Sequence, residues 1–311
     1  MKYTSLSDYF KSTYHTKVYK LALSSGCSCP NRDGTLGTGG CIFCSEGGSG
    51  DFAAPFSPLP EQIAFAKEKV AGKFSKSIAL EDRRYFAYFQ SYTNTYGDPH
   101  RLEKLYREVL AEPDILGVSI GTRPDCISDE MLEILARLNR EKPVWVELGL
   151  QTIHEKTARR IKRGYELSVF DENYRRLKAA GLTVIVHVIL GLPDETKEDM
   201  METVSYLGDR LSPGDGVKLQ LLHVLTGTQL AREYEAAPFH ILTLEEYTDL
   251  VVSALQILPE EIVIHRITGD GPKSLLIEPK WSADKKRVLN TLNRAIAEAS
   301  PVADSTYKEE V

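Results

Sequence analysis

The residues from Leu182 to Leu190, LTVIVHVIL, form a nearly continuous run of β-branched and aliphatic side chains. A strand of this composition is buried on both of its faces, as the strands of parallel sheets are. Such sheets occur in proteins whose strands alternate with covering helices. The run therefore points to an α/β fold, and the rest of the chain can be tested against that expectation.

The chain contains six units in which a strand pattern is followed by a helical pattern. The predicted strands are 18–23, 84–90, 115–120, 144–150, 182–190 and 216–223, and the helical patterns between them are 61–73, 100–110, 129–138, 155–180 and 198–211. Six units in one direction predict an α/β fold, a partial (β/α)6 barrel over residues 1–225.

The pattern changes after Thr226. Residues 226–311 are predicted to form a C-terminal α/β extension that covers the substrate side. It contains helices at 230–235 and 244–258, a strand at 261–265, a polar loop at 265–280 and a helix capped by Ser282. Residues 3–17 form a polar, aromatic-rich lead-in to the first strand.

Three cysteines, Cys29, Cys41 and Cys44, lie in a glycine-rich loop, residues 24–52, that follows the first strand. Thiolates are soft ligands, and a Cys-x-x-Cys pair brings two sulfurs to one metal or one cluster. A structural zinc site normally closes with four protein ligands, whereas three sulfurs leave one position open. The loop therefore predicts a [4Fe–4S] cluster in which one iron is free for a small molecule.

Two other interpretations of the loop compete with this one. The cysteines could be ordinary buried thiols, although the loop is polar and rich in glycine. They could also hold zinc, with Cys27 or Cys126 as the fourth ligand. Cys29 is preferred over Cys27 as the first ligand because Pro30 ends the strand there, so that Cys29 lies where the loop turns back.

The net charge of −6 argues against broad nonspecific binding of nucleic acid, but it leaves room for a local basic patch. Five cysteines, three of them in one loop, do not resemble a disulfide framework. A reducing compartment, the cytoplasm, is expected. The first residues contain no apolar run of signal-peptide length, and no apolar run in the sequence is as long as a membrane span, so neither element is expected.

The cysteine loop on the first strand of a six-unit chain resembles the radical S-adenosylmethionine (radical SAM) superfamily. Within it, the chain is similar to the YtqA/YhcC-type subgroup of the Elongator-catalytic-subunit-like branch. The motifs that carry this resemblance cover nearly the whole chain: CPNRDGTLGTGGCIFC, GSGDF, YFQSYTNTY, SIGTRPDC, VELGLQT, GLPDET and HRITGDGPK with LLIEPKWSADK. The spacing of the cysteines is longer than in the superfamily's commonest pattern.

The resemblance implies that Cys29, Cys41 and Cys44 hold a [4Fe–4S] cluster and that S-adenosyl-L-methionine chelates the fourth iron. An electron delivered by a reductant such as flavodoxin or ferredoxin would cleave the sulfonium. The product would be a 5′-deoxyadenosyl radical that abstracts a hydrogen atom from the substrate. Members of the subgroup are connected with tRNA, where a carboxymethylaminomethyl group on the wobble uridine becomes aminomethyl.

Candidates for binding S-adenosylmethionine lie where strands end, because the active site of such a barrel is found there. Gln90 and Asn94 follow the second strand, at the place of the superfamily's Gly-Gly-Glu stretch, although those glycines are absent here. Glu147 and Gln151 share one face of the fourth strand, where they suit ribose hydroxyls. A polar strand end and a buried structural glutamate are the competing interpretations.

Two further cofactor candidates follow later strands. Arg163 belongs to a basic cluster and could pair with the methionine carboxylate, although a solvated helix face explains the cluster equally well. Gly191 would let the backbone approach adenine closely, unless it is part of an ordinary turn.

Candidates on the substrate side come from the sixth strand end and from the late polar loop. The loop brings histidine, arginine and lysine together without an evident packing purpose, and a charged helix face is the alternative for the lysines that follow. The substrate-side candidates are His223, His265, Arg266, Asp270, Lys273 and Trp281.

Three functions therefore remain open. The first is a radical SAM enzyme acting on tRNA uridine, and the second is the same chemistry on a protein or small-molecule substrate. The third is a noncatalytic zinc module in an RNA-binding protein. The colour and the iron content of the protein after anaerobic reconstitution separate the third from the other two.

Overall fold

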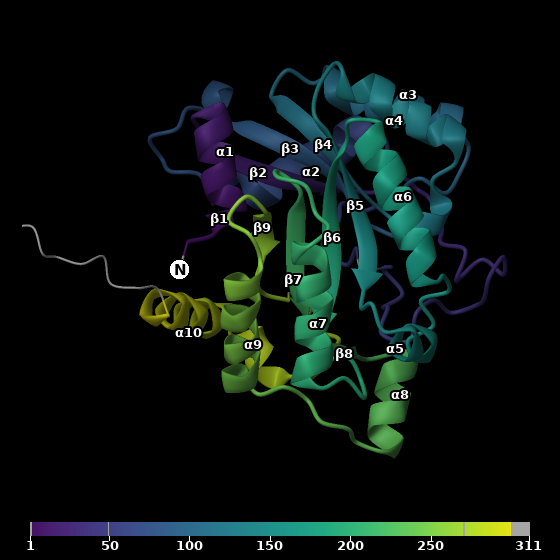
Figure 1. Ribbon diagram of the computed structural model, residues 1–311. Coiled ribbons are helices and arrows are strands. Elements are labelled where there is room, and N and C mark those ends of the chain that lie inside the picture. The colour runs from purple at the N-terminus through teal and green to yellow at the C-terminus, as the bar shows by residue number, and fades with distance from the viewer. Residues whose placement is uncertain (1, 49, 270, 300–311) are drawn as a thin grey trace, which may run out of the picture.

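The computed structural model describes residues 2–48, 50–269 and 271–299, and its centre is one curled sheet of eight strands (Figure 1). All of the strand pairs in this sheet are parallel, in the order β1-β9-β7-β6-β5-β4-β3-β2. The six consecutive strands are β2 (Val18–Leu23), β3 (Arg84–Phe89), β4 (Ile115–Thr122), β5 (Val144–Gln151), β6 (Thr183–Leu190) and β7 (Gly216–Leu221). The predicted partial (β/α)6 barrel is confirmed.

Helices on the outside of the sheet connect successive strands. They are α2 (Leu59–Ala71), α3 (Pro99–Ala111), α4 (Asp129–Asn139), α5 (Glu155–Arg160), α6 (Leu167–Ala179) and α7 (Lys197–Gly208). Side-chain caps fix where several of them begin: Asp98 caps α3, Ser128 caps α4, and Thr196 forms a capping box with Asp199 at α7. The apolar faces of these helices and of the strands form the main core.

The N-terminal residues are not the simple lead-in that the sequence predicts. They form the two-residue strand β1 (Thr4–Ser5) and helix α1 (Leu6–Tyr14), which Ser5 caps. Phe10 of α1 is 3% exposed and packs against Phe86 and Trp145 inside the barrel. Helix α1 thus plugs the amino-terminal end of the barrel with a small aromatic core.

The C-terminal extension adds to the same sheet. Strand β9 (Val263–Arg266) pairs with β7 on one side and with β1 on the other, so the sheet continues past residue 225. The expected loop at 265–280 includes β10 (Leu276–Glu278), which pairs with β8 (Val224–Leu225). The remaining helices are α8 (Gln229–Ala236), α9 (Leu244–Ile257) and α10 (Lys285–Glu298), with 3-10 turns at Leu80–Asp82, Pro124–Cys126 and Lys280–Ala283.

The expected cap of the last helix was wrong. Asp284 caps α10 by accepting a hydrogen bond from the backbone N–H of Arg287. Ser282 instead lies in a 3-10 turn, where its hydroxyl donates to the carbonyl of Pro279. Because of this turn the helix cap is Asp284, two residues after Ser282. The hydroxyl of Ser282 lies 3.1 Å from His223 Nε2. Among the helices of the described ranges, none combines the length and the apolar character needed to cross a membrane.

We expect Phe10→Ala to destabilise the protein by about 3–5 kcal/mol, because it empties a closed aromatic site. The measurement is the midpoint of thermal unfolding. Phe56→Ala is the matched control, since Phe56 is 70% exposed and its loss should cost about 0.5 kcal/mol or less. Equal shifts in the two variants would show that α1 does not plug the barrel.

Candidate active site

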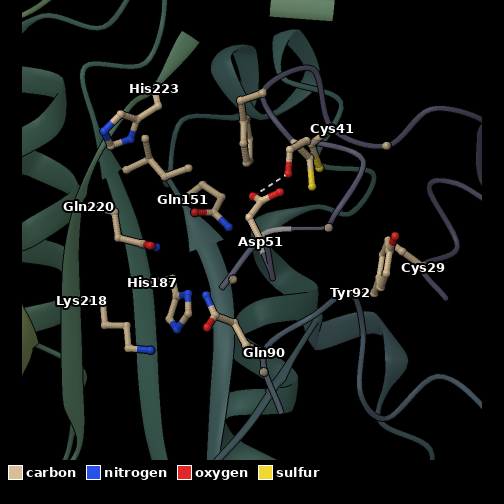
Figure 2. A pocket seen from close by; sticks show the side chains of 18 of the residues that line it. Cys29, Cys41, Asp51, Gln90, Tyr92, Gln151, His187, Lys218, Gln220 and His223 are labelled. Carbon is tan, nitrogen blue, oxygen red and sulfur yellow. Dashed lines mark hydrogen bonds between the residues drawn. The ribbon is translucent and has the colours of Figure 1, made fainter. Parts of the chain in front are cut away.

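A cavity of about 240 Å³ opens at the carboxyl ends of the barrel strands, and Cys29, Cys41 and Cys44 all line it. Figure 2 shows Cys29 and Cys41 on one side of this space, with Lys218, Gln220 and His223 on the opposite side. The loop and the strand ends therefore face one another across a common space, as the barrel predicts. We call this space the cysteine cavity.

Hydrogen bonds to two other parts of the chain, the end of α5 and helix α8, hold the cysteine loop in place. The backbone N–H of Ile42 donates to Ile161 O at the end of α5, and Ile42 O accepts from the backbone N–H of Leu230 in α8. The Asn31 amide donates to the carbonyls of Lys162 and Arg163. Ile42 itself is buried in a small apolar cluster with both helices. The cysteines are thus carried by a loop that is anchored at Ile42, directly after Cys41.

The thiol of Cys41 lies in an environment that disfavours a bare thiolate. Burial, together with the nearby sulfurs of Cys44 and Cys29, raises its pKa to about 12, while Arg123 and the Asn31 amide oppose the shift. A thiol of this kind stays protonated at neutral pH unless a metal cation displaces its proton. The geometry of the three sulfurs then decides which metal group they suit.

At least two of the three sulfurs lie too far apart to bind the same metal ion. Sulfurs bound to one tetrahedral zinc lie about 3.8 Å apart, given Zn–S bonds of about 2.3 Å. Cys29, Cys41 and Cys44 are not among the described groups whose ligand atoms all lie within 4.8 Å of one another. In a cluster each sulfur binds a different iron, which requires a wider spacing.

The other two cysteines do not line the cysteine cavity, although Cys126 lies close enough to Cys29 for that residue to affect the pKa of its thiol. The Cys27 sulfur is buried, where it accepts a hydrogen bond from Arg101 of α3. Cys126 lies in the 3-10 turn after β4, next to Asp125, and burial raises the pKa of its thiol to about 12. Neither residue lines the cysteine cavity.

Glu147 occupies the middle of the barrel interior and is 1% exposed. Its carboxylate accepts hydrogen bonds from Lys20, Ser119, His187 and Lys218, which lie on β2, β4, β6 and β7. A carboxylate offers about four lone-pair sites, so these four donors saturate it. The prediction that Glu147 binds ribose hydroxyls is therefore not supported, although the residue does line the cavity.

Gln151, by contrast, is available to a ligand. It lines the cysteine cavity, and its Oε1 is buried without a hydrogen-bond partner among the described residues. The register of β5 with β6 shifts between Gly149 and Gln151, and Gln151 has a left-handed φ of 69°. Irregularities of this kind re-aim a side chain at a functional site. Gln90 also lines the cavity.

Two of the predicted cofactor residues, Asn94 and Gly191, lie outside the cavity and serve the protein itself. Asn94 is fully buried, and its amide bonds the carbonyls of Phe89 and Gly121 instead of facing the cavity. A Cβ on Gly191 would meet Leu242 at 2.9 Å, so this glycine accommodates a neighbouring side chain. Neither residue lines the cysteine cavity.

Arg163 does line the cavity, but it is 2% exposed and most of its donors are used. It donates to the carbonyls of Tyr165, Leu150 and Thr152 and lies 3.3 Å from the Glu155 carboxylate. These bonds shape the turn after β5. Arg163 therefore has little donor capacity left for the expected pairing with a methionine carboxylate.

A second cavity, of about 900 Å³, lies beside the first at the open side of the barrel. We call it the wide cavity. Tyr88, Gln90, Lys218 and Arg266 line both spaces, so the two are adjacent along the barrel interior. A molecule in the wide cavity would reach the cysteine cavity by way of these side chains.

The structure brings four of the substrate-side candidates to these cavities. His223 lines the cysteine cavity, His265 and Lys273 line the wide cavity, and Arg266 lines both. Asp270 lies outside the described residues. Trp281 lines neither cavity: its indole donates to Leu242 O, and its ring packs against Tyr247. It holds the extension against α9.

The two lysines of the barrel interior, Lys20 and Lys218, were not among the predicted site residues. Lys20 and Lys218 each stand in the middle of an otherwise apolar strand, VYKLAL and GVKLQL. A lysine is almost never buried unless it is paired, so a charge at such a position is itself a signal. Arg123, whose guanidinium bonds Arg163 O and lies near the thiols of Cys29 and Cys41, was also missed.

Comparison with known families agrees with this geometry. The Radical SAM superfamily model matches residues 34–207, and the Radical_SAM C-terminal domain model matches residues 214–298. The chain belongs to the radical SAM superfamily. Radical SAM proteins bind a [4Fe–4S] cluster and S-adenosylmethionine, so the predicted cofactors are confirmed at the level of the family.

The relatives place the chain within the superfamily. It is 41% identical to YtqA of Bacillus subtilis over 95% of this chain and 89% of that protein. It is 34% identical to YhcC of Escherichia coli K12 over 92% of this chain and 89% of that protein. The predicted YtqA/YhcC-type subgroup is confirmed. The fold matches that of the archaeal Methanocaldococcus infernus Elp3 with a TM-score of 0.63, at 17% identity, over 89% of this chain and 63% of that one.

The cavity fits these cofactors in two respects. Three thiols line it, and at least two of them lie too far apart to bind the same metal ion. The same cavity contains a buried acceptor, Gln151 Oε1, that no described residue satisfies. An unsatisfied buried acceptor costs free energy unless a ligand donates to it.

We expect Cys29→Ala, Cys41→Ala and Cys44→Ala each to lose most of the cluster after anaerobic reconstitution, because each removes one thiolate. The measurement is iron and sulfide per chain. Cys27→Ala and Cys126→Ala are the matched controls and should keep the wild-type content. Loss of iron in either control variant would indicate that the substituted cysteine is a cluster ligand.

We expect Gln151→Leu to weaken S-adenosylmethionine binding about tenfold, because it removes one hydrogen-bond acceptor. The melting temperature should not fall through loss of this acceptor, since Gln151 Oε1 has no hydrogen-bond partner within the described protein. The measurement is equilibrium dialysis with cluster-loaded protein.

Gln62→Leu is the matched control for this change. Gln62 is 2% exposed, and its amide bonds Ser24 and Ser57, so its loss should lower the melting temperature and leave the ligand affinity unchanged. Wild-type affinity in Gln151→Leu would show that Gln151 does not contact the ligand.

Proposed function

We propose that this radical SAM enzyme modifies the wobble uridine of tRNA and converts a carboxymethylaminomethyl side chain to aminomethyl. We assign Cys29, Cys41 and Cys44 as the cluster ligands and Gln151 and Gln90 as contacts of S-adenosylmethionine. The cluster and S-adenosylmethionine, when bound, supply the radical that removes a substrate hydrogen. The chain itself binds and orients the substrate and excludes water from the barrel.

The observation that carries the tRNA proposal is the charge of the wide cavity. Its described lining contains eight lysines and arginines but Asp51 as the single acidic residue. Five of these cations are exposed at the mouth: Lys17, Lys69, Lys73, Lys273 and Lys285. An acidic protein that concentrates positive charge around one opening is suited to a polyanion, and phosphates dominate the affinity of proteins for nucleic acid.

The C-terminal extension, residues 226–311, has a part in this proposal as the cover of the substrate side. Lys273 and Lys285 of the extension line the same wide cavity as Lys17 and Lys69 from the N-terminal part. Cations from both parts of the chain could together contact a nucleic-acid backbone.

The test is mass spectrometry of tRNA nucleosides from cells that lack this protein. We expect carboxymethylaminomethyluridine to accumulate and aminomethyluridine and its derivatives to fall. Expression of the wild-type chain should restore the pattern, and the Cys41→Ala variant, matched in expression, should not.

The second measurement uses purified, reconstituted enzyme with reductant, S-adenosylmethionine and tRNA from the deletion strain. Unchanged uridine in both experiments, together with release of 5′-deoxyadenosine, would reject tRNA. It would direct the same chemistry to a protein or small-molecule substrate.

A further inference from the structure

Among the described residues, the middle of the barrel interior contains more positive than negative charge. Lys20 and Lys218 share a single carboxylate, that of Glu147, and Arg266 lies close enough to affect the pKa of both lysines. Each ionised lysine needs a counter-charge where water is excluded. Glu147 provides one, so the group has room for a second anion.

Lys218 is the lysine best placed to receive this anion. It is 5% exposed and lines both the wide cavity and the cysteine cavity. Its ammonium donates to Glu147 and to the hydroxyl of Tyr88. A lysine has three N–H donors, so one remains without a partner among the described residues. Figure 2 shows the side chain across the space from the cysteines.

We infer that Lys218 binds the carboxylate of the substrate's side chain at the junction of the two cavities. This inference rests on the proposed function, in which the reacting group ends in a carboxylate and the product does not. With the carboxylate on Lys218, the carbon that bears it lies at the boundary of the cysteine cavity. The buried cation would then favour the uridine that still bears the carboxymethyl group over the product that has lost it.

The charge state of Lys218 makes the inference testable in a second way. Burial, reinforced by Lys20 and Arg266 and opposed by Glu147, lowers the pKa of Lys218 to about 7. Lys218 is therefore largely charged below pH 7 and loses its charge above it. The other groups that face it are Tyr88, with its pKa raised well above 10, and His187 and His265, with pKa values lowered by burial.

The test measures binding of tRNA without reductant, so that no turnover occurs. The two probes are the same tRNA bearing either carboxymethylaminomethyluridine or aminomethyluridine at the wobble position. We expect the wild-type enzyme to prefer the carboxylate by about tenfold to a hundredfold at pH 6.5. The preference should shrink between pH 7 and 8.5, because the ammonium loses its proton there.

Lys218→Met should abolish this preference and leave the affinity for the aminomethyl tRNA unchanged. Lys218→Gln, which keeps hydrogen-bonding capacity to Tyr88 and Glu147 without the charge, should behave in the same way and serves if the methionine variant does not fold. The double variant Lys69→Gln/Lys73→Gln is the matched control: it should weaken both tRNAs equally and keep the preference.

The outcomes separate this inference from the function on which it rests. Suppose the enzyme converts the tRNA, but the preference for the carboxylate-bearing tRNA persists in the Lys218 variants or across the pH series. That result would refute the carboxylate site and leave the proposed function intact. A wild-type enzyme that neither converts the tRNA nor distinguishes the two probes refutes both. Loss of the preference in Lys69→Gln/Lys73→Gln would also overturn the assignment, because it would move the carboxylate to the mouth.

Discussion

A single buried carboxylate, Glu147, connects the strands of this barrel through its interior. Side chains from β2, β4, β6 and β7 converge on it, so five strands share one electrostatic centre. Removing one partner from such a group is costly, since it leaves a charge buried without compensation. The middle layer of the barrel is therefore polar and ordered. Below it lies the aromatic plug that includes Phe10 and Trp145, and above it lies the cysteine cavity.

The three layers of the barrel interior have different roles. The plug closes the end of the barrel that carries no chemistry, and α1 supplies it from a segment far from the plugged strands in sequence. The charged layer faces the wide cavity, where a substrate would enter. The cysteine loop lies at the carboxyl ends of the strands, away from the plug, and is held by α5 and α8. Substrate and cofactor can thus approach one point from different sides, as a reaction between them requires.

Much of the fold could be predicted from local pattern. The six strands lie within two residues of their predicted bounds because a buried parallel strand needs an uninterrupted apolar run, and such a run is visible in the sequence. The segments that were missed or misplaced are short or depend on distant partners. β1 has two residues and exists because it pairs with β9, some 260 positions later. Helix α1 shows few apolar residues, so its role as a plug is apparent only once Phe10 meets Trp145.

The site divides in the same manner. The sequence by itself determined that three thiols, placed close together in a loop after the first strand, would meet at one end of a parallel barrel, because spacing and strand direction are local properties. Only the tertiary structure decided which polar atoms are already satisfied. Glu147 is saturated by partners from other strands and Arg163 has used four of its five donors within the protein, whereas Gln151 and Lys218 keep capacity for a ligand. Hydrogen-bond capacity is used up by neighbours in space, and Lys20 lies 127 positions from the carboxylate it donates to.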